Sequence, residues 1–522
     1  MSYEPGEFRD TCGACEWIFD FFAHGFDYLN GRFMPSPDET LGSKWSAAQD
    51  EISRQNIVSD IVKSDGAIPA SVRRYLDIPG GDVEMQSPDF YIRLFSVLSA
   101  VDRAAADLNY LRAHTRIGGK RWTRVTEHFE RHGKQLQQKV PGYVVFKPRY
   151  FQRAPYQKWA DAAVKHREWT PIPHRGEYLE SYFENLLRVH APGDCTLEFR
   201  ILNPTQDFHE PTWSTLRVGI VPLVQELKVR ASDAQLLPGP LILKKESSAS
   251  PPSFSVQIDG VPSDVCRDLC KRAEAALVHL AQRGCQVIMF PELVMPDPVL
   301  KHVKGVLASL AAEDRDRPCL TLAGTFTRLL TAHHPTKPFN VAVVLNDRGE
   351  ELWRQRKAQP YDMHRHEQQR FGLDSLLQCD PCRENIAFMP RSILSVDSRA
   401  SGMRMMVLIC EDLTRAPGTK AVRDLQPTLI LTPVMAGPLE ADGGFAGSID
   451  QLVREKDGIF VVANSAALAK AAWKSPGDPP LGLLGLPLLN IAQNYRPFEP
   501  ITKADVLPGS ADLEVLFYQF PK

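Results

Sequence analysis

The sequence lacks the features that mark membrane and secreted proteins. No stretch reaches the roughly 18 uninterrupted apolar residues that a membrane helix needs, and the first residues do not run from a basic stretch into an apolar one. Ten cysteines in 522 residues, without an export signal, are typical of reduced thiols and not of a disulfide framework. We therefore expect a cytoplasmic protein that makes no contact with a membrane.

Repeats and biased composition are also absent. No internal period of about 20 to 50 residues is visible, which argues against a solenoid or propeller, and no long segment is of low complexity. The chain is 43% hydrophobic and 24% charged, as is ordinary for a soluble globular protein. Its 522 residues are enough for two or three domains with a sizeable core.

The formal net charge of -2 hides a strong asymmetry. Residues 1–111 have a net charge of -9, whereas residues 112–175 have a net charge of +11 and interleave their bases with aromatic residues. Such a mixture can contact phosphates and stack bases, and the candidate anion- or nucleic-acid-binding residues are Arg121, Arg124, Lys147, Arg149 and Arg153. The opposed charges favour the alternative, in which the basic segment packs against the acidic one within the chain.

The first 211 residues read mainly as helix. Between residues 90 and 111, apolar residues recur at steps of three and four and form one stripe, as in an amphipathic helix. "GEYLESYFENLLRVH" repeats this pattern with Leu179, Tyr182, Leu186 and Leu187, and the proline-broken "VPGYVVFKPRYFQRAP" between them suggests loops with a short strand. We expect residues 1–211 to form a mainly α-helical domain with an acidic part (1–111) and a basic part (112–175).

From about residue 212 the pattern becomes that of an α/β domain. Short apolar runs such as "LRVGIVPLV", "CQVIMF", "NVAVVLN" and "PTLILTPV" alternate with helical patterns, which suits a sheet covered on both faces. Ser263 and Gly284 bracket one predicted helix as N-cap and C-terminal stop. The polar "KKESSASPPS" is predicted to be an exposed loop.

Metal binding is not expected. The pairs Cys12/Cys15 and Cys379/Cys382 are more than 360 residues apart, so they are more typical of unrelated thiols than of a zinc site. His364 and His366 alternate as in a strand or loop, and no third ligand is evident. We expect neither a metal nor another cofactor.

Three predicted strands end in residues suited to acyl transfer. "VIMFPEL" ends at Glu292, "LWRQRKAQ" at Lys357 and "VLICEDL" at Cys410. A nucleophilic thiol needs a base and a nearby cation, and the oxyanion that forms needs fixed donors. Glu292 is the candidate base, and Lys357 and the backbone N–H of Glu411 are the candidate oxyanion donors.

These motifs, in this order, resemble the nitrilase superfamily of carbon–nitrogen hydrolases over about residues 214–520. The resemblance implies Glu292 as general base, Lys357 as stabiliser of the intermediate and Cys410 as nucleophile. It also implies a second glutamate, best matched by Glu367, that holds Lys357 and the substrate. The expected fold of residues 212–522 is a four-layer αββα sandwich, commonly assembled into homo-oligomers.

We therefore expect a hydrolase of a non-peptide carbon–nitrogen bond in a small molecule, an amide in preference to a nitrile. The alternative is a catalytically silent nitrilase-like scaffold or assembly protein whose N-terminal region binds nucleic acid or a protein partner in a stress or defence setting. The sequence does not identify the substrate.

Overall fold

The structure, a computed structural model, describes the following residues: 8, 15, 18–30, 32, 47–48, 50–64, 67–76, 85–114, 143–146, 186–189, 195–202, 216–224, 242–246, 253–257, 263–313, 316–328, 337–398, 403–440, 444–455, 458–485, 498–501, 504–506 and 514–519. The chain divides into two compact units, Met1–Pro148 with Val164–Ala191, and Arg149–Ala163 with Pro192–Lys522. No helix in these described ranges is long and apolar enough to cross a membrane.

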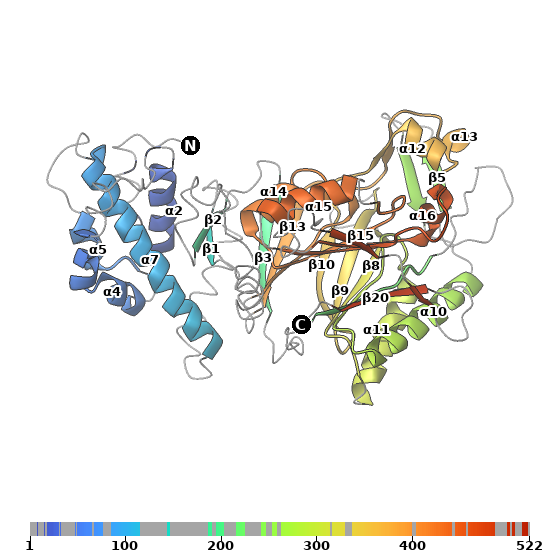
Figure 1. The fold of residues 1–522 in the computed structure, drawn as a ribbon, viewed down its shortest axis with the longest axis horizontal. Helices are drawn as coiled ribbons and strands as arrows, with labels where there is room; N and C mark the ends of the chain where they lie inside the picture. Colours follow the sequence, from blue (N-terminus) through green and yellow to red (C-terminus); the bar gives the residue numbers. More distant parts are fainter. Residues whose placement is uncertain are drawn as a thin grey trace, which may run out of the picture. The chain divides into compact units, whose positions relative to one another are not determined.

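The first unit is built around one long helix. The helices described in it are α2 (Ile18–Leu29), α4 (Ile57–Lys63), α5 (Ala70–Leu76) and α7 (Pro88–His114), and α2, α4 and α5 all contact α7 (Figure 1). The predicted stripe of α7 is buried from Phe90 to Ala105, and Leu94 and Leu98 in it lie directly over Gly25 of α2. A Cβ at Gly25 would lie 2.9 Å from Leu98, so the close approach of the two helices requires glycine there.

Part of the predicted N-terminal helical region is strand. Leu186 and Leu187, which were assigned to a helical stripe, lie in β2 (Leu186–Val189), paired antiparallel with β1 (Tyr143–Phe146). The helix prediction is therefore wrong at these two residues, because "LLRV" reads equally well as a strand once "YVVF" is available as a partner. Residues 178–185 of the same pattern lie outside the described residues.

The second unit is a mixed α/β structure with two seven-stranded sheets. The first sheet has the order β10-β9-β8-β7-β4-β20-β19 and the second β18-β17-β16-β15-β14-β13-β3. The first comprises β4 (Arg217–Ile220), β7 (Val287–Met289), β8 (Leu320–Arg328), β9 (Phe339–Asn346), β10 (Glu351–Arg356), β19 (Ala504–Val506) and β20 (Glu514–Gln519). The second comprises β3 (Cys195–Leu202), β13 (Arg391–Ser398), β14 (Arg404–Val407), β15 (Leu429–Val434), β16 (Ile459–Asn464), β17 (Gly482–Gly485) and β18 (Phe498–Ile501).

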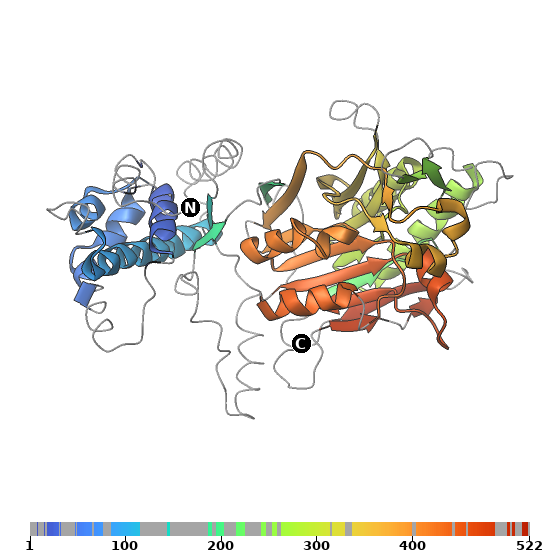
Figure 2. The same ribbon diagram turned by 90° about the horizontal axis from the view of Figure 1, so that it is seen from above.

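Helices cover each of these sheets. α10 (Ser263–Gln282) and α11 (Asp297–Ala312) pack on each other beside the first sheet, where Leu280 contacts Gly219 of β4. α14 (Gly418–Leu425) and α15 (Gly444–Glu455) lie side by side on the second sheet (Figure 2), and Ile449 of α15 contacts Gly485 of β17. The strands β9, β15 and β16, each of which lies between two other strands, are buried along their whole length.

The ends of α10 follow from its sequence. The helix begins at Ser263, and Gly284 takes a left-handed φ of 69° directly after it. The N–H of Gly284 bonds Ala281 O, and the N–H of Cys285 bonds Leu280 O, as in a Schellman motif. The prediction that Gly284 ends this helix is confirmed.

A small third sheet corrects two local predictions. It has the order β11-β12-β6-β5, with β11 (Asp362–Met363), β12 (Cys382–Glu384), β6 (Ser253–Gln257) and β5 (Ile242–Glu246). The "KKE" predicted as loop is the end of β5, because antiparallel pairing with β6 satisfies its backbone. "RHEQQR", predicted as strand or loop, is the short helix α12 (Arg365–Arg370). Two other short helices of this unit are α13 (Asp374–Leu377), which comes next in the chain, and α16 (Ala466–Ala472), which follows β16.

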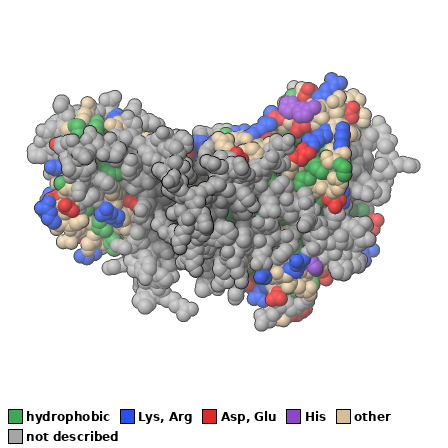
Figure 3. Space-filling model, in the orientation of Figure 1, with side chains coloured by type: hydrophobic (Ala, Val, Ile, Leu, Met, Phe, Trp, Pro, Cys, Tyr) green, Lys and Arg blue, Asp and Glu red, His purple; other side chains and the backbone are tan. Residues whose placement is uncertain are grey.

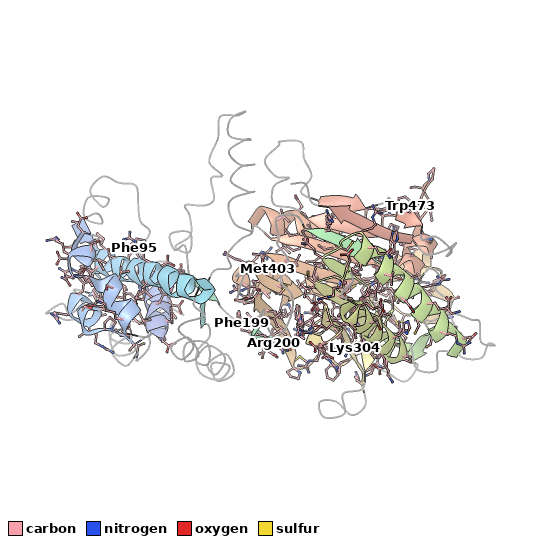
Figure 4. The ribbon with its side chains drawn as sticks, turned by 90° about the horizontal axis from the view of Figure 1, so that it is seen from below. Phe95, Phe199, Arg200, Lys304, Met403 and Trp473 are labelled. Carbon is pink, nitrogen blue, oxygen red and sulfur yellow. The ribbon has the colours of Figure 1, made fainter. Side chains whose placement is uncertain are left out.

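An ion pair ties three elements at the edge of the second sheet. Arg404 of β14 is 1% exposed; its Nε lies 2.8 Å from Asp397 Oδ1 of β13, and its Nη1 donates to Leu425 O at the end of α14. Its guanidinium also lies over the ring of Phe199 in β3. Figure 4 shows Phe199, Arg200 and Met403 together at this edge.

Candidate active site

Cys410 lies just past the end of β14, on a strained backbone. Leu408 continues the parallel pairing with β15, and the chain then turns into a short 3-10 helix, Cys410–Leu413. Cys410 itself has a φ of 50°, which non-glycine residues adopt only where surrounding structure holds them. Cys410 is 4% exposed, and its thiol lies close enough to the carboxylate of Glu292 to act as a hydrogen-bond donor that lowers the pKa of that carboxyl.

Glu292 and Lys357 meet beside this thiol, as the strand-end pattern predicts. Lys357 Nζ lies 2.8 Å from Glu292 Oε1, and both side chains are 2% exposed. Glu292 follows β7 and also accepts the backbone N–H of Met435 at Oε2 (3.1 Å). Lys357 follows β10, where its N–H bonds Asn340 O. Three distant segments therefore converge on one sulfur, although their roles in a reaction stay predictions.

Two residues that the sequence analysis did not single out complete the network. Glu384, the last residue of β12, accepts from Lys357 Nζ at 2.7 Å. Asn340 of β9 donates from Nδ2 to Glu292 Oε1 (2.8 Å) and to Glu384 Oε1 (3.4 Å). Two buried carboxylates thus share one ammonium and one amide, and Asn340 must present its NH₂ because an amide oxygen there would face both carboxylates.

The electrostatics keep the resting thiol neutral. Burial, and then the charge of Glu292, raise the pKa of Cys410 well above its ordinary value, against the opposing effect of Lys357. Burial also raises the pKa of Glu292, with Lys357 acting against it. Burial alone would lower the pKa of Lys357, but Glu292 and Glu384 outweigh it and raise that pKa. The site therefore pairs a thiol with a carboxylate that can take its proton.

Glu411 pairs its carboxylate with neighbouring residues, yet its charge still raises the pKa of Cys410. Its carboxylate lies 2.7 Å from Arg415 Nε and accepts from the hydroxyl of Thr414. Its N–H belongs to the first turn of the 3-10 helix, where backbone donors have no acceptor within the helix. This N–H is thus available to an oxyanion, which is the role predicted for it.

Glu367 does not hold Lys357, contrary to the expectation. Its Oε1 accepts from the hydroxyl of Tyr361 (2.6 Å), and its Oε2 accepts from the N–H of His364, at the start of α12. Because the carboxylate caps this helix, it is not free to reach the lysine. Glu384 makes the contact instead, and its Oε2 also accepts the N–H of Tyr361 (3.0 Å), so Tyr361 links the two glutamates.

Other predicted sites are only partly covered by the structure. The described residues contain no group of three or more His, Cys, Asp or Glu side chains that could hold a metal ion. The rings of His364 and His366 stack at 6.0 Å, and histidines gather with basic side chains over α12 (Figure 3). All five candidate nucleic-acid-binding residues, Arg121, Arg124, Lys147, Arg149 and Arg153, lie outside the described residues, as does Cys12.

Comparisons with known proteins give structural neighbours only. No family model and no curated protein matches the sequence. The structure is similar to Saccharomyces cerevisiae Nit3, a member of branch 10 of the nitrilase superfamily, with 10% identity, a TM-score of 0.33, and coverage of 58% of this chain and 89% of Nit3.

A second neighbour is an amidase from Nesterenkonia sp., with 13% identity, a TM-score of 0.32, and coverage of 59% of this chain and 90% of the amidase. A variant of the amidase from Nesterenkonia sp. AN1 that carries acrylamide on its active-site cysteine has 13% identity, a TM-score of 0.33, and coverage of 59% and 93%. Identities and TM-scores this low do not assign the chain to a family.

Proposed function

We propose that this protein hydrolyses a non-peptide carbon–nitrogen bond, an amide in preference to a nitrile, with Cys410 as nucleophile. The observation that carries the proposal is the buried arrangement in which one carboxylate, Glu292, contacts both the Cys410 thiol and the Lys357 ammonium. A carboxylate base that lies beside both a thiol and a cation brings together the groups that thiol-dependent acyl transfer needs.

In the first half of the proposed reaction, Glu292 takes the proton of the thiol as sulfur attacks the carbonyl carbon. The C–O π electrons move onto oxygen, and Lys357 Nζ and the N–H of Glu411 stabilise the oxyanion. Each such donor is worth about 3 kcal/mol in transition-state stabilisation. When the carbonyl re-forms, the C–N bond breaks, protonated Glu292 gives its proton to the departing nitrogen, and a thioester on Cys410 remains.

In the second half, a water molecule attacks the thioester. Glu292, now ionised again, takes a proton from this water, and the same two donors stabilise the second oxyanion. Collapse breaks the C–S bond, returns a proton to sulfur and releases the carboxylic acid. In the resting site the charges of Glu292 and Glu384 hold the pKa of Lys357 above its ordinary value. While Glu292 is protonated, the negative oxyanion beside Lys357 replaces the charge of Glu292, so Lys357 keeps its proton.

The same proposal covers family and architecture. Two sheets covered by α10/α11 and by α14/α15 support a four-layer αββα arrangement, and the order of "FPEL", "RK" and "ICEDL" supports membership of the nitrilase superfamily. A homo-oligomer and a cytoplasmic location stay predictions.

Alkylation of the thiol tests the proposal. Intact mass after exposure to chloroacetamide, an amide with a displaceable halide, is expected to show one fast adduct that Cys410→Ala abolishes and Glu292→Gln slows. The half-buried thiols of Cys266 and Cys379 provide the internal comparison. If Cys410 reacts no faster than they do, the hydrolase proposal fails and the scaffold alternative is favoured. If Cys410 does react faster than they do, a screen of amides for ammonia release would identify the substrate.

A further inference from the structure

Asp412 is fully buried two residues after the nucleophile, and the reaction above does not use it. Its Oδ1 accepts the backbone N–H groups of Ala358 (3.0 Å) and Gln359 (2.8 Å), and its Oδ2 accepts that of Ile409 (3.2 Å). The first two residues directly follow Lys357, whereas Ile409 directly precedes the cysteine. One carboxylate thus joins the segment of the cation to the segment of the sulfur.

The arrangement requires a side chain that only accepts hydrogen bonds. Three N–H donors converge on the two oxygens of Asp412, and a carboxylate offers about four lone-pair sites for them. An asparagine of the same shape would turn an NH₂ group toward at least one donor. Burial raises the pKa of Asp412 to about 7, while the three backbone donors and Lys357 act against this shift.

The backbone of Asp412 is held as firmly as its side chain. Its N–H bonds Ile409 O at 3.0 Å. On its other side lies Gly418, the first residue of α14, so close that a Cβ there would lie 1.7 Å from Asp412 O. Asp412 therefore has little room to shift, and its carboxylate acts as a fixed reference point for both segments.

The charge partners of Lys357 do not depend on this acid. They are Glu292 at 2.8 Å and Glu384 at 2.7 Å, which come from other elements. Loss of the Asp412 carboxylate would leave that buried network intact while releasing the segment that carries the sulfur.

We propose that Asp412 is a positioning residue that sets the placement of Cys410 relative to Lys357 and Glu292. This inference rests on the proposed function. It makes a selective prediction: removing the carboxylate harms the reactivity of the thiol far more than it harms the fold, because misplacement of reacting groups by about 1 Å can cost about 100-fold in rate.

The test compares Asp412→Asn with Asp424→Asn, which makes the same chemical change at a partly exposed residue of α14 paired with Lys420. Alkylation of Cys410 by chloroacetamide is followed by intact mass over a range of reagent concentrations, well below each melting temperature. For Asp412→Asn we expect the maximal rate to fall about 100-fold, with the half-saturating concentration nearly unchanged. For Asp424→Asn we expect neither value to change.

The possible outcomes distinguish the proposed hydrolase function from the positioning role of Asp412. A wild-type Cys410 that reacts no faster than Cys266 contradicts the proposed function itself. A fast wild type together with an equally fast Asp412→Asn overturns only the positioning role. A purely structural role for Asp412 would lower the melting temperature and leave the rate per folded molecule unchanged.

Hydrogen exchange of the unaltered chain covers the case in which Asp412→Asn does not fold. Because one carboxylate holds the amides of Ala358, Gln359 and Ile409, their protection factors should be similar and should fall together when the pH is lowered enough to protonate Asp412. Among the charged neighbours, Lys357 acts most strongly on this carboxylate. Protection factors that differ widely, or that do not change together, would overturn the inference.

Discussion

The carboxylate of Glu292 has two opposite effects on the thiol beside it. Its charge raises the pKa of Cys410 and so disfavours the thiolate, yet as a base it supplies the acceptor for the thiol proton. Glu292→Gln separates these effects. With that charge removed, Lys357 is opposed by one carboxylate fewer, so the pKa of Cys410 should fall below its wild-type value.

The same variant should nevertheless react more slowly. Loss of a general base typically costs about 100-fold or more, and a glutamine cannot take the proton. The ultraviolet absorbance of the thiolate, titrated against pH with Cys410→Ala subtracted, reports the pKa, and ammonia release from an amide reports the rate. A variant with an unchanged rate would show that Glu292 is not the base.

Asn340 donates a hydrogen bond to Glu292 and should therefore influence the pKa of Glu292. Asn340→Leu removes the amide donor from two carboxylates that then share only Lys357, which should raise the pKa of Glu292 further. Because a base with a raised pKa stays protonated to higher pH, the acid limb of the rate of Cys410 alkylation should move to higher pH. We also expect a stability loss of about 1–3 kcal/mol from the lost donor. An acid limb at the wild-type pH would contradict this role.

At the residue scale, the sequence predicts a site residue only where the residues before it form a recognisable strand pattern. Glu292, Lys357 and Cys410 each follow a recognisable strand pattern, so each could be singled out. Their meeting joins two sheets, because β7 and β10 belong to the first sheet and β14 to the second. Glu384 ends a three-residue strand, β12, that no pattern announces. Asn340 stands at the start of a buried strand, where asparagine usually signals a turn. The one available signal was that a polar residue inside "FNVAVVLN" needs a buried partner.

At the scale of elements, breaking the buried ion pair of Arg404 and Asp397 should cost more stability than breaking an exposed ion pair. Asp397→Ala leaves a guanidinium that is 1% exposed without its carboxylate, which typically costs about 3–5 kcal/mol. Urea unfolding monitored by circular dichroism measures the loss. Asp424→Ala, which breaks the exposed pair with Lys420 in the same unit, should cost about 0–1 kcal/mol. Equal losses of unfolding free energy in the two variants would mean that breaking the buried pair costs no more than breaking the exposed pair.

Sequence patterns mispredicted some elements for two physical reasons: a distant pairing partner, or an element too short to show a period. The "KKE" of β5 and the "LLRV" of β2 are strands because a distant or weakly patterned partner pairs with them. α12 is only six residues long, too short for periodicity to show, and it is stabilised by the Glu367 side chain that caps it. By contrast, α7 and α10 are long and amphipathic, and their own residues determine them.

At the scale of the whole molecule, β3 shows how a non-local pairing escapes a local pattern. β3 pairs in parallel with β13 over eight positions, from Cys195 with Arg391 to Leu202 with Ser398. Nearly 200 residues of sequence separate the two strands. An α/β domain that began at residue 212, as predicted, would not include β3. The compact unit that contains the site instead includes Pro192–Lys522.

Two fragments distinguish these boundaries. Residues 192–522 retain β3, and we expect this fragment to fold and its Cys410 to be alkylated within about twofold of the full-length rate, since all groups that contact the sulfur lie in it. Residues 212–522 lack β3, so the edge of β13 becomes unpaired, and the apolar contacts of Leu197 and Leu202 are lost. We expect this shorter fragment to melt at a lower temperature and to aggregate in size-exclusion chromatography. If both fragments were equally stable and monodisperse, β3 would be dispensable and the boundary at residue 212 would stand; if both lost the reactivity of Cys410, residues before 192 would contribute to the site.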